Sequence, residues 1–148
     1  MKEEIIKIKL LKENAKVPTY GSVYSAGADL YACINEDIHI KPFETAFIST
    51  GLSIEIKEGF VGLIYARSGL SCKEGLAPAN KVGVIDSDYR GELIIALYNQ
   101  SNKEKVVKQN DRIAQIVFTP YVKGNFEVIE NLSNTQRGKG GFGSTGTN

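Results

Sequence analysis

The chain has 148 residues, of which 42% are hydrophobic and 24% charged, and its formal net charge is +1. This length and composition predict one globular domain with a hydrophobic core of its own. The small net charge excludes a broad basic surface for duplex nucleic acid. Without a long apolar run we expect no membrane span, and the N-terminus "MKEEIIKIKLLKEN" is too charged for a signal peptide.

The residue inventory also narrows the chemistry. His39 is the only histidine, which argues against a Ser-His-Asp triad and against a zinc site built on several histidines. Cys33 and Cys72 lie 39 positions apart with no C-x-x-C spacing, so we expect reduced thiols rather than a disulfide. We therefore expect a cytoplasmic protein, or one of the host cytoplasm if a virus or prophage encodes it.

Short segments of alternating or β-branched residues fill most of the chain and predict strands. In chain order, the predicted strands span residues 5–11, 45–50, 52–59, 59–66, 81–86, 92–99 and 111–118. Lys57 to Gly59 predict a hairpin turn, and only residues 69–76 have the character of a helical turn or two. About nine to eleven strands at this spacing predict an all-β fold, a distorted jelly roll or β-barrel.

Five polar segments punctuated by glycine interrupt these strands and carry the candidate functional residues. They are Ser25–Ala32, Ala66–Ser71, Asn80–Glu92, Gln109–Phe118 and Arg137–Gly146.

The segment "ARSGLS" places Arg67 and Ser68 beside Gly69. A guanidinium and a hydroxyl suit phosphate oxygens, and the glycine lets the backbone approach them closely. An alternative interpretation of the same segment is a turn that starts a short helix, with Ser68 as its N-cap. The two interpretations are compatible, because a helix N-terminus itself binds anions.

The segment "GVIDSDYRGE" predicts a β-hairpin with a wide polar tip. Asp86 and Asp88 are two positions apart and would point the same way on a strand, so one could act as a general base or both could bind a cation. The alternative is a solvated tip with a surface ion pair to Arg90. Tyr89 favours a functional tip, because an exposed aromatic ring needs something to pack on.

Two isolated polar residues stand at or within apolar strands. Asp29 begins an apolar strand, where a turn-forming aspartate is the ordinary interpretation. Gln115 interrupts the apolar run of 111–118, so its amide must find partners in the backbone or in a ligand.

The C-terminal segment contains "GKGGFG", which fits the spacing G-x-G-x-x-G. No helix and no βαβ unit accompany it, so it is not a dinucleotide fingerprint, and the chain has no P-loop. Five of the last eleven residues are glycine, which predicts a flexible arm. Arg137 and Phe142 are unusual in a plain linker and indicate a functional arm.

Taken together and in order, the five segments resemble the five signature motifs of the trimeric dUTP pyrophosphatases (dUTPases), from about Ser25 to Gly146. The resemblance implies a jelly-roll domain over residues 1–136 and an arm over residues 137–148. It implies a homotrimer in which the arm reaches the site of a neighbouring subunit. It also implies hydrolysis of dUTP to dUMP and pyrophosphate with Mg2+.

The same resemblance implies residue roles. Asp86 aligns with the general base that activates a water, and Asp29 with a carboxylate that meets the metal through water. Substrate-binding roles fall to Arg67, Ser68, Gly69, Asn80, Gly83, Val84, Ile85, Tyr89, Ile94, Gln115, Arg137, Phe142, Gly143, Ser144 and Thr145. Of these, Asn80, Gly83 to Ile85 and Ile94 align with the uracil pocket, Tyr89 with the ring beneath the deoxyribose, and Phe142 with the ring that stacks on uracil. Phosphate contacts fall to Arg67, Ser68, Gly69, Gln115, Arg137, Ser144 and Thr145.

Two other functions remain open. A dCTP deaminase has the same fold and some of these motifs, but "VIDSDYRGE" and the phenylalanine-bearing arm are more similar to a dUTPase. A nucleotide-binding regulator or structural subunit would keep the fold without the reaction, and the intact set of motifs argues against it.

Overall fold

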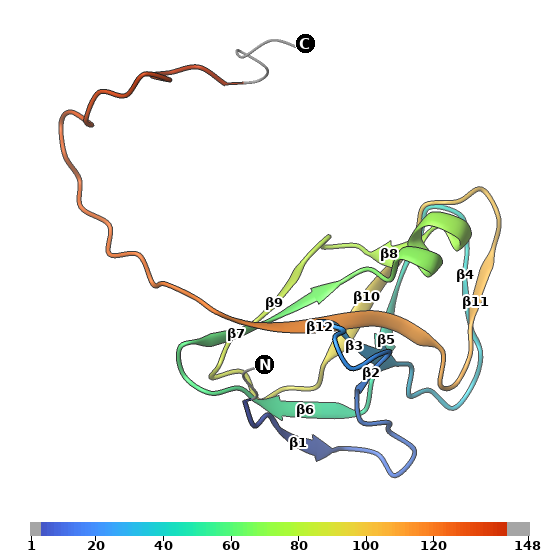
Figure 1. The fold of residues 1–148 in the computed structure, drawn as a ribbon. Coiled ribbons are helices and arrows are strands. Elements are labelled where there is room, and N and C mark those ends of the chain that lie inside the picture. The colour runs from blue at the N-terminus through green and yellow to red at the C-terminus, as the bar shows by residue number, and fades with distance from the viewer. Residues whose placement is uncertain (1–3, 142–148) are drawn as a thin grey trace.

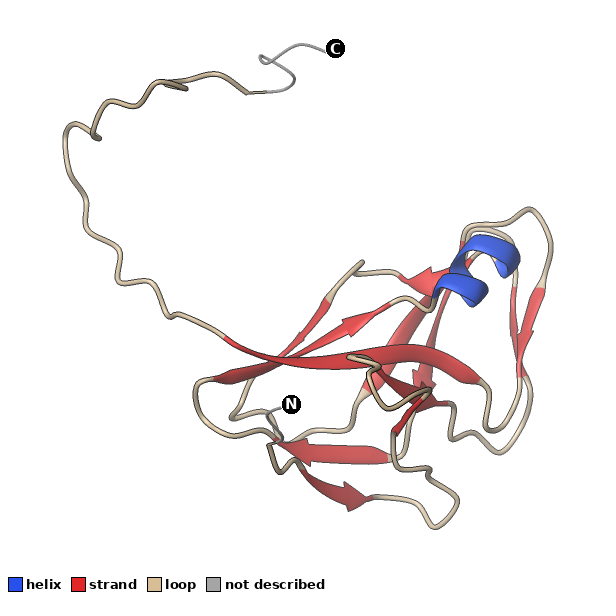
Figure 2. Cartoon of the chain, viewed as in Figure 1, coloured by secondary structure: helices blue, strands red, loops and turns tan. Residues whose placement is uncertain are grey.

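The computed structural model describes residues 4–141 and contains almost only strands (Figure 1, Figure 2). The strands are β1 (Lys7–Leu10), β2 (Thr19–Tyr20), β3 (Ala28–Tyr31), β4 (Ile38–Ile40), β5 (Thr45–Ser49), β6 (Leu52–Glu55), β7 (Phe60–Tyr65), β8 (Leu76–Pro78), β9 (Gly83–Ile85), β10 (Ile94–Asn99), β11 (Lys105–Val107) and β12 (Arg112–Pro120). A helical turn, η1 (Leu70–Glu74), lies between β7 and β8. The predicted all-β fold, a distorted jelly roll, is confirmed.

The strands form one large sheet and three smaller ones. The large sheet has the order β2-β3-β12-β7-β9, and the others are β5-β10-β8, β1-β6 and β4-β11. All of the pairings are antiparallel. Within residues 4–141, no helix has the length and apolar character needed to cross a membrane.

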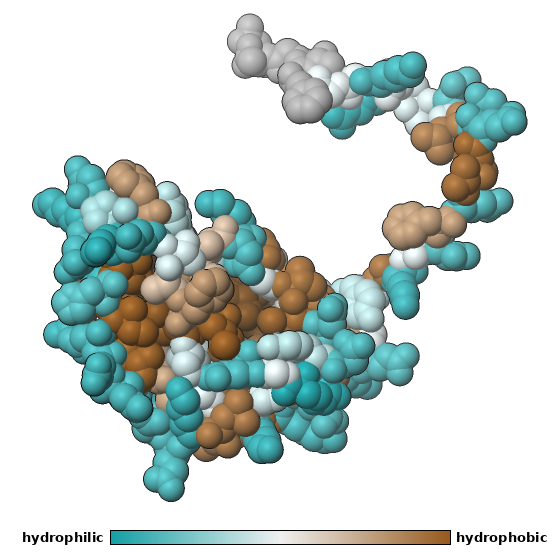
Figure 3. Space-filling view, turned by 180° about the vertical axis from the view of Figure 1, so that it is seen from behind, coloured by the Kyte–Doolittle hydropathy of each residue, from teal (hydrophilic) through white to brown (hydrophobic). Residues whose placement is uncertain are grey.

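The hydrophobic core lies where the inner faces of these sheets meet. On β10, Ile95, Leu97 and Asn99 are buried, while the residues between them are partly exposed. This alternation follows from the two-residue period of a strand and gives one inward and one outward face. On the outside of the body, hydrophobic side chains still gather on the face turned away from the viewer of Figure 1 (Figure 3).

Each of the seven predicted strand ranges contains all or most of a strand. The described residues form further short strands, so their total of twelve exceeds the predicted nine to eleven. Both predicted hairpins were wrong. The turn at Lys57–Gly59 exists, with Gly59 at φ 84°, but β6 pairs with β1 while β7 pairs with β12 and β9. In the same way, β9 pairs with β7 while β10 pairs with β5 and β8, so the "GVIDSDYRGE" segment crosses between two sheets. The two cysteines are unpaired, as predicted.

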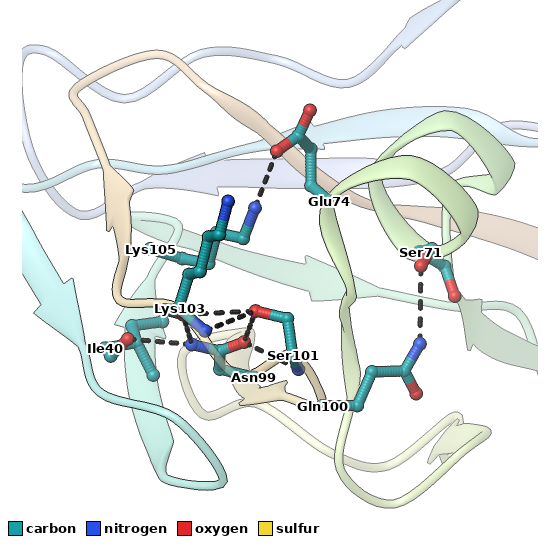
Figure 4. A network of polar contacts seen from close by, with 8 residues as sticks. All are labelled: Ile40, Ser71, Glu74, Asn99, Gln100, Ser101, Lys103 and Lys105. Atoms are coloured by element: carbon teal, nitrogen blue, oxygen red, sulfur yellow. Dashed lines mark hydrogen bonds and ion pairs between the residues drawn. The ribbon is translucent and has the colours of Figure 1, made fainter.

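A buried asparagine ties the end of β10 to the loops around it (Figure 4). The Asn99 amide nitrogen donates to the carbonyls of Ile40 at 2.9 Å, Lys41 at 3.2 Å and Lys103 at 2.7 Å. Its oxygen accepts from the backbone N–H and the hydroxyl of Ser101. Every donor and acceptor of this buried side chain is therefore used, which fixes the chain where β10 ends.

The segment after β10 in turn holds η1. Gln100 donates from its backbone N–H to the Gly75 carbonyl and from its side chain to the Ser71 carbonyl. Lys105 lies 2.8 Å from Glu74, and this hydrogen bond lowers the pKa of the Glu74 carboxyl. The end of β10 thereby positions the helical turn that follows Arg67 and Ser68.

We expect Asn99→Ala to lower the free energy of unfolding by about 2–4 kcal/mol, because it leaves buried carbonyls without a donor. Urea denaturation at a fixed protein concentration measures this. Asn102→Ala is the matched control, since Asn102 lies in the same loop with an exposed side chain. Equal stabilities for the two variants would show that the Asn99 network contributes nothing.

Candidate active site

A row of polar residues crosses the outer face of the large sheet. In the pairing register, Asp29 of β3 lies opposite Gln115 of β12, and Gln115 lies opposite Tyr65 of β7. Their neighbours Ala28 and Ile116 are buried on the inner face. Strand alternation therefore carries these three side chains to one side of the sheet, which forms the floor of a cleft.

This cleft has a volume of about 510 Å3. We call it the phosphate-side cleft, after the phosphate contacts that the sequence predicts for Arg67, Ser68, Gly69 and Gln115. It is lined by Gly21, Ser25, Ala26, Gly27, Asp29, Tyr65, Arg67, Ser68, Gly69, Arg112, Gln115 and Val117. The predicted residues Asp29, Arg67, Ser68, Gly69 and Gln115 thus all meet in one place.

A carboxylate joins two arginines in the cleft. Asp29, whose side chain is 14% exposed, accepts from Arg67 Nε at 2.7 Å and from Arg112 Nη1 at 3.3 Å. Arg67 also donates from Nη1 to the backbone carbonyl of Arg112 at 3.3 Å. The carboxylate and the carbonyl together fix the plane of the Arg67 guanidinium at the cleft wall. Arg112 is absent from the predicted set.

The other polar groups of the cleft are held by the backbone. Gln115 donates from Nε2 to the Ala66 carbonyl at 2.8 Å, which leaves its amide oxygen toward Gly27. A Cβ at Gly27 would overlap that amide, so the close approach requires glycine. Ser68 makes no capping hydrogen bond to η1, whose N-cap position is Gly69. The N-cap interpretation of Ser68 was therefore wrong, and Ser68 is an exposed residue in the lining of the cleft.

A second, smaller pocket of about 190 Å3 is formed by residues of β9, of β10 and of the segment between them. It is lined by Val84, Ile85, Asp86, Tyr89, Glu92, Leu93 and Ile94. We call it the base pocket, after the nucleobase contacts that the sequence predicts for Val84, Ile85 and Ile94. The predicted base, the predicted sugar-facing ring and most of the predicted uracil pocket are therefore neighbours. Asn80 lies beside this group, with its amide nitrogen 3.3 Å from where a Cβ of Gly83 would be.

Tyr89 is held across this pocket by the residues that follow it. Its hydroxyl donates to the Glu92 carbonyl at 2.9 Å, and its ring covers Gly91, where a Cβ would clash. The Glu92 carboxylate accepts from the hydroxyl of Ser49 and from the backbone N–H of Gly51. The loop is thus anchored to the turn between β5 and β6. Glu92 and Gly91 are supporting residues that the sequence motifs alone did not single out.

The two pockets lie toward opposite ends of β7. Ile85, which precedes Asp86, pairs with Gly62, whereas Arg67 follows the far end of the strand. The five steps from Gly62 to Arg67 span roughly 16 Å in extended chain, at about 3.3 Å per residue. Within one chain, Asp86 therefore does not reach the groups around Arg67.

The chain after β12, which leads to the C-terminal arm, leaves the body and extends away from it (Figure 1). The Arg137 guanidinium donates to the Gly140 carbonyl at 2.9 Å, a local turn rather than a contact with either pocket. The predicted residues Phe142, Gly143, Ser144 and Thr145 lie outside the described residues.

Metal ligands are sparse. Residues 4–141 contain no group of three or more His, Cys, Asp or Glu side chains that could hold a metal ion. Asp29 is the only carboxylate lining the phosphate-side cleft, and both of its oxygens already accept from arginines. This donor set does not suit a resident ion, but it fits a Mg2+ ion that arrives on phosphate oxygens and keeps its waters.

Comparison with known proteins decides the family. The dUTPase family model matches residues 13–146. The chain belongs to the dUTPase family. It is 49% identical to the deoxyuridine 5'-triphosphate nucleotidohydrolase of Clostridium tetani (strain Massachusetts / E88), over 99% of each chain. It is also 49% identical to the protein of that name from Desulfitobacterium hafniense (strain DSM 10664 / DCB-2), over 95% of this chain and 97% of that one.

Solved structures of dUTPases have the same fold. A mutant of the Staphylococcus bacteriophage 80alpha dUTPase with dUpNHpp superposes with a TM-score of 0.89 at 28% identity, covering 98% of this chain and 100% of that one. The dUTPase from phage phi11 of S. aureus superposes with a TM-score of 0.81 at 26% identity, covering 89% and 100%. Both likenesses extend over nearly the whole domain.

Proposed function

We propose that this chain hydrolyses dUTP to dUMP and pyrophosphate, which lowers dUTP and supplies the precursor of dTMP. The observation that carries the proposal is the pocket between β9 and β10, with Asp86 at its margin and Tyr89 across it, in a chain of the dUTPase family. We place the reaction in the cytoplasm, where the nucleotide pool lies.

The base would be recognised mainly by backbone groups. β9 is an edge strand of its sheet, so its second edge offers N–H and C=O groups that the sheet does not use. Uracil can complement such an edge, whereas cytosine exchanges donor and acceptor at position 4 and leaves buried groups unpaired. Rejection of this kind reaches about 10⁴-fold. The narrow pocket also disfavours the methyl group of thymine.

The sugar would lie against Tyr89. The ring is held in one place by the hydrogen bond to the Glu92 carbonyl and by its packing on Gly91, which has no Cβ in the way. A ribose 2′-hydroxyl would then meet an apolar ring face and lose its hydrogen bonds. The same ring therefore favours deoxyribose.

The phosphates would occupy the phosphate-side cleft, in contact with Arg67, Ser68, Gly69 and Gln115. In-line hydrolysis requires a positioned water and dense positive charge around the phosphates. Asp86 would take the proton of the water that attacks the α-phosphorus. Mg2+ on the triphosphate would offset charge on the pyrophosphate leaving group, and Asp29 is the carboxylate that would meet its waters.

The reaction requires more than one copy of the chain. A general base must come within about 3 Å of the proton that it takes, and the strand β7 keeps Asp86 away from the cleft of its own chain. A homotrimer brings the base pocket of one copy to the phosphate-side cleft of the next, because a head-to-tail interface can close into a ring. Exposed Phe47, Val84 and Ile94 supply apolar surface for such contacts.

The arm would complete the site of a neighbouring copy. In the segment that leads from β12 to the arm, the side chains Val122, Phe126, Val128 and Leu132 are 83–100% exposed and are free to pack on a neighbouring copy. Arg137, Ser144 and Thr145 would contact the γ-phosphate, Gly143 would let the backbone approach, and Phe142 would stack on uracil.

A substrate panel tests the proposal. With Mg2+, the full-length protein should release pyrophosphate from dUTP and about 10⁴-fold less from dCTP, dTTP and UTP. Release of ammonia from dCTP would instead identify a deaminase. Nucleotide binding without any product would identify a regulator.

Asp86→Asn should keep nucleotide binding and lower the turnover of dUTP by about 10²–10⁴-fold, since the amide cannot accept the proton. Calorimetric binding of a non-hydrolysable dUTP analogue and steady-state turnover separate the two effects. Asp88→Asn is the control, because Asp88 is outside the pocket lining and should retain activity. Wild-type turnover of Asp86→Asn would remove Asp86 from the mechanism.

A chain ending at Gln136 should stay folded and trimeric but lose roughly a hundredfold or more of its turnover, because the site is left open to water. Sedimentation and dUTP hydrolysis measure the two properties. A chain ending at Gly146 is the matched control, since it lacks only the last two residues. Full activity of the shorter chain would contradict the role of the arm.

A further inference from the structure

An irregularity in β12 determines which way Arg112 points. The pairing of β12 with β3 shifts register between Arg112 and Ala114, where a β-bulge inserts one residue. As a result, the consecutive residues Ile113 and Ala114 are both buried. Regular alternation from Gln115 would turn Arg112 toward the core. The bulge instead places Arg112 on the same face as Gln115, in the lining of the phosphate-side cleft.

The charge of the cleft depends on this placement. Its charged lining residues are Asp29, Arg67 and Arg112, which sum to −1 + 1 + 1 = +1. Asp29 is within hydrogen-bond distance of both arginines, so Asp29 and Arg67 alone would form a neutral pair. Such a pair offers a polyanion little net attraction at a distance.

We infer that Arg112 is a further phosphate-binding residue, and that it supplies the net positive charge of the cleft. The inference deepens the proposed function, because it concerns the same cleft and a triphosphate ligand. The Arg112 side chain is 53% exposed, beside an Asp29 that is only 14% exposed. It therefore stays within reach of an incoming anion while the carboxylate holds it at the cleft.

The test measures binding of metal-free inorganic triphosphate to the full-length protein by calorimetry at low and high salt. Arg112→Gln should bind it about tenfold more weakly at low salt, and the difference should shrink at high salt because screening weakens the attraction. Arg112→Lys should stay within about threefold of wild type, since it keeps the charge but loses the planar fork.

Lys108→Gln is the matched control. It removes the same charge four positions away, from a side chain that is 67% exposed and outside the cleft, and should bind within about twofold of wild type. Thermal unfolding of each variant confirms that the domain is intact. Unchanged binding by Arg112→Gln, an equal loss in Lys108→Gln, or an equal loss in Arg112→Lys would overturn the inference.

The triphosphate measurement does not depend on hydrolysis. If the wild-type protein fails to hydrolyse dUTP, the proposed function fails, while binding of inorganic triphosphate still decides the role of Arg112.

Discussion

The pairing of β12 between β3 and β7 is the constraint on which the phosphate-side cleft depends. One register places Asp29, Gln115 and Tyr65 in a row on the outer face and Ile116 in the core. A slip of one residue would turn Asp29 or Gln115 inward and expose apolar side chains. Burying an unpaired carboxylate costs several kcal/mol, so the core and the cleft select the same register.

The same sheet that builds the cleft also separates it from the second pocket within one chain. β7 is paired on both edges, with β12 and with β9, and a strand held in this way cannot fold back to bring its two ends together. The base pocket and the cleft are therefore fixed apart by roughly 16 Å of strand. In the proposed homotrimer, association would supply the missing proximity, and it would also remove water from charges that one chain leaves partly exposed.

The sequence predicted the positions of strands and turns better than it predicted which strands pair with each other. Alternation located seven strands, because burial on one face imposes a two-residue period. The turn at Lys57–Gly59 was also found, since a glycine with positive φ reverses the chain locally, but such a turn does not decide which strands pair. Arg112 was missed for a related reason: a β-bulge depends on the partner strand, so strict alternation assigns that residue to the wrong face.

The two pockets differ in how tightly hydrogen bonds hold their lining side chains. This difference suits the proposed ligands, a nucleobase in one pocket and phosphates in the other. Tyr89 and Glu92 are held by hydrogen bonds to the backbone and to Ser49, so the base pocket has little freedom to adapt. Rejecting a wrong base through unpaired polar groups works only if those groups cannot move to find new partners. The phosphate-side cleft instead has a half-exposed Arg112 beside the more buried Arg67. The attraction of such charges for an anion would fall slowly with distance and would tolerate movement of the anion. In the proposed function, selectivity would therefore reside in the rigid pocket, while the charged cleft would provide affinity that every nucleoside triphosphate shares.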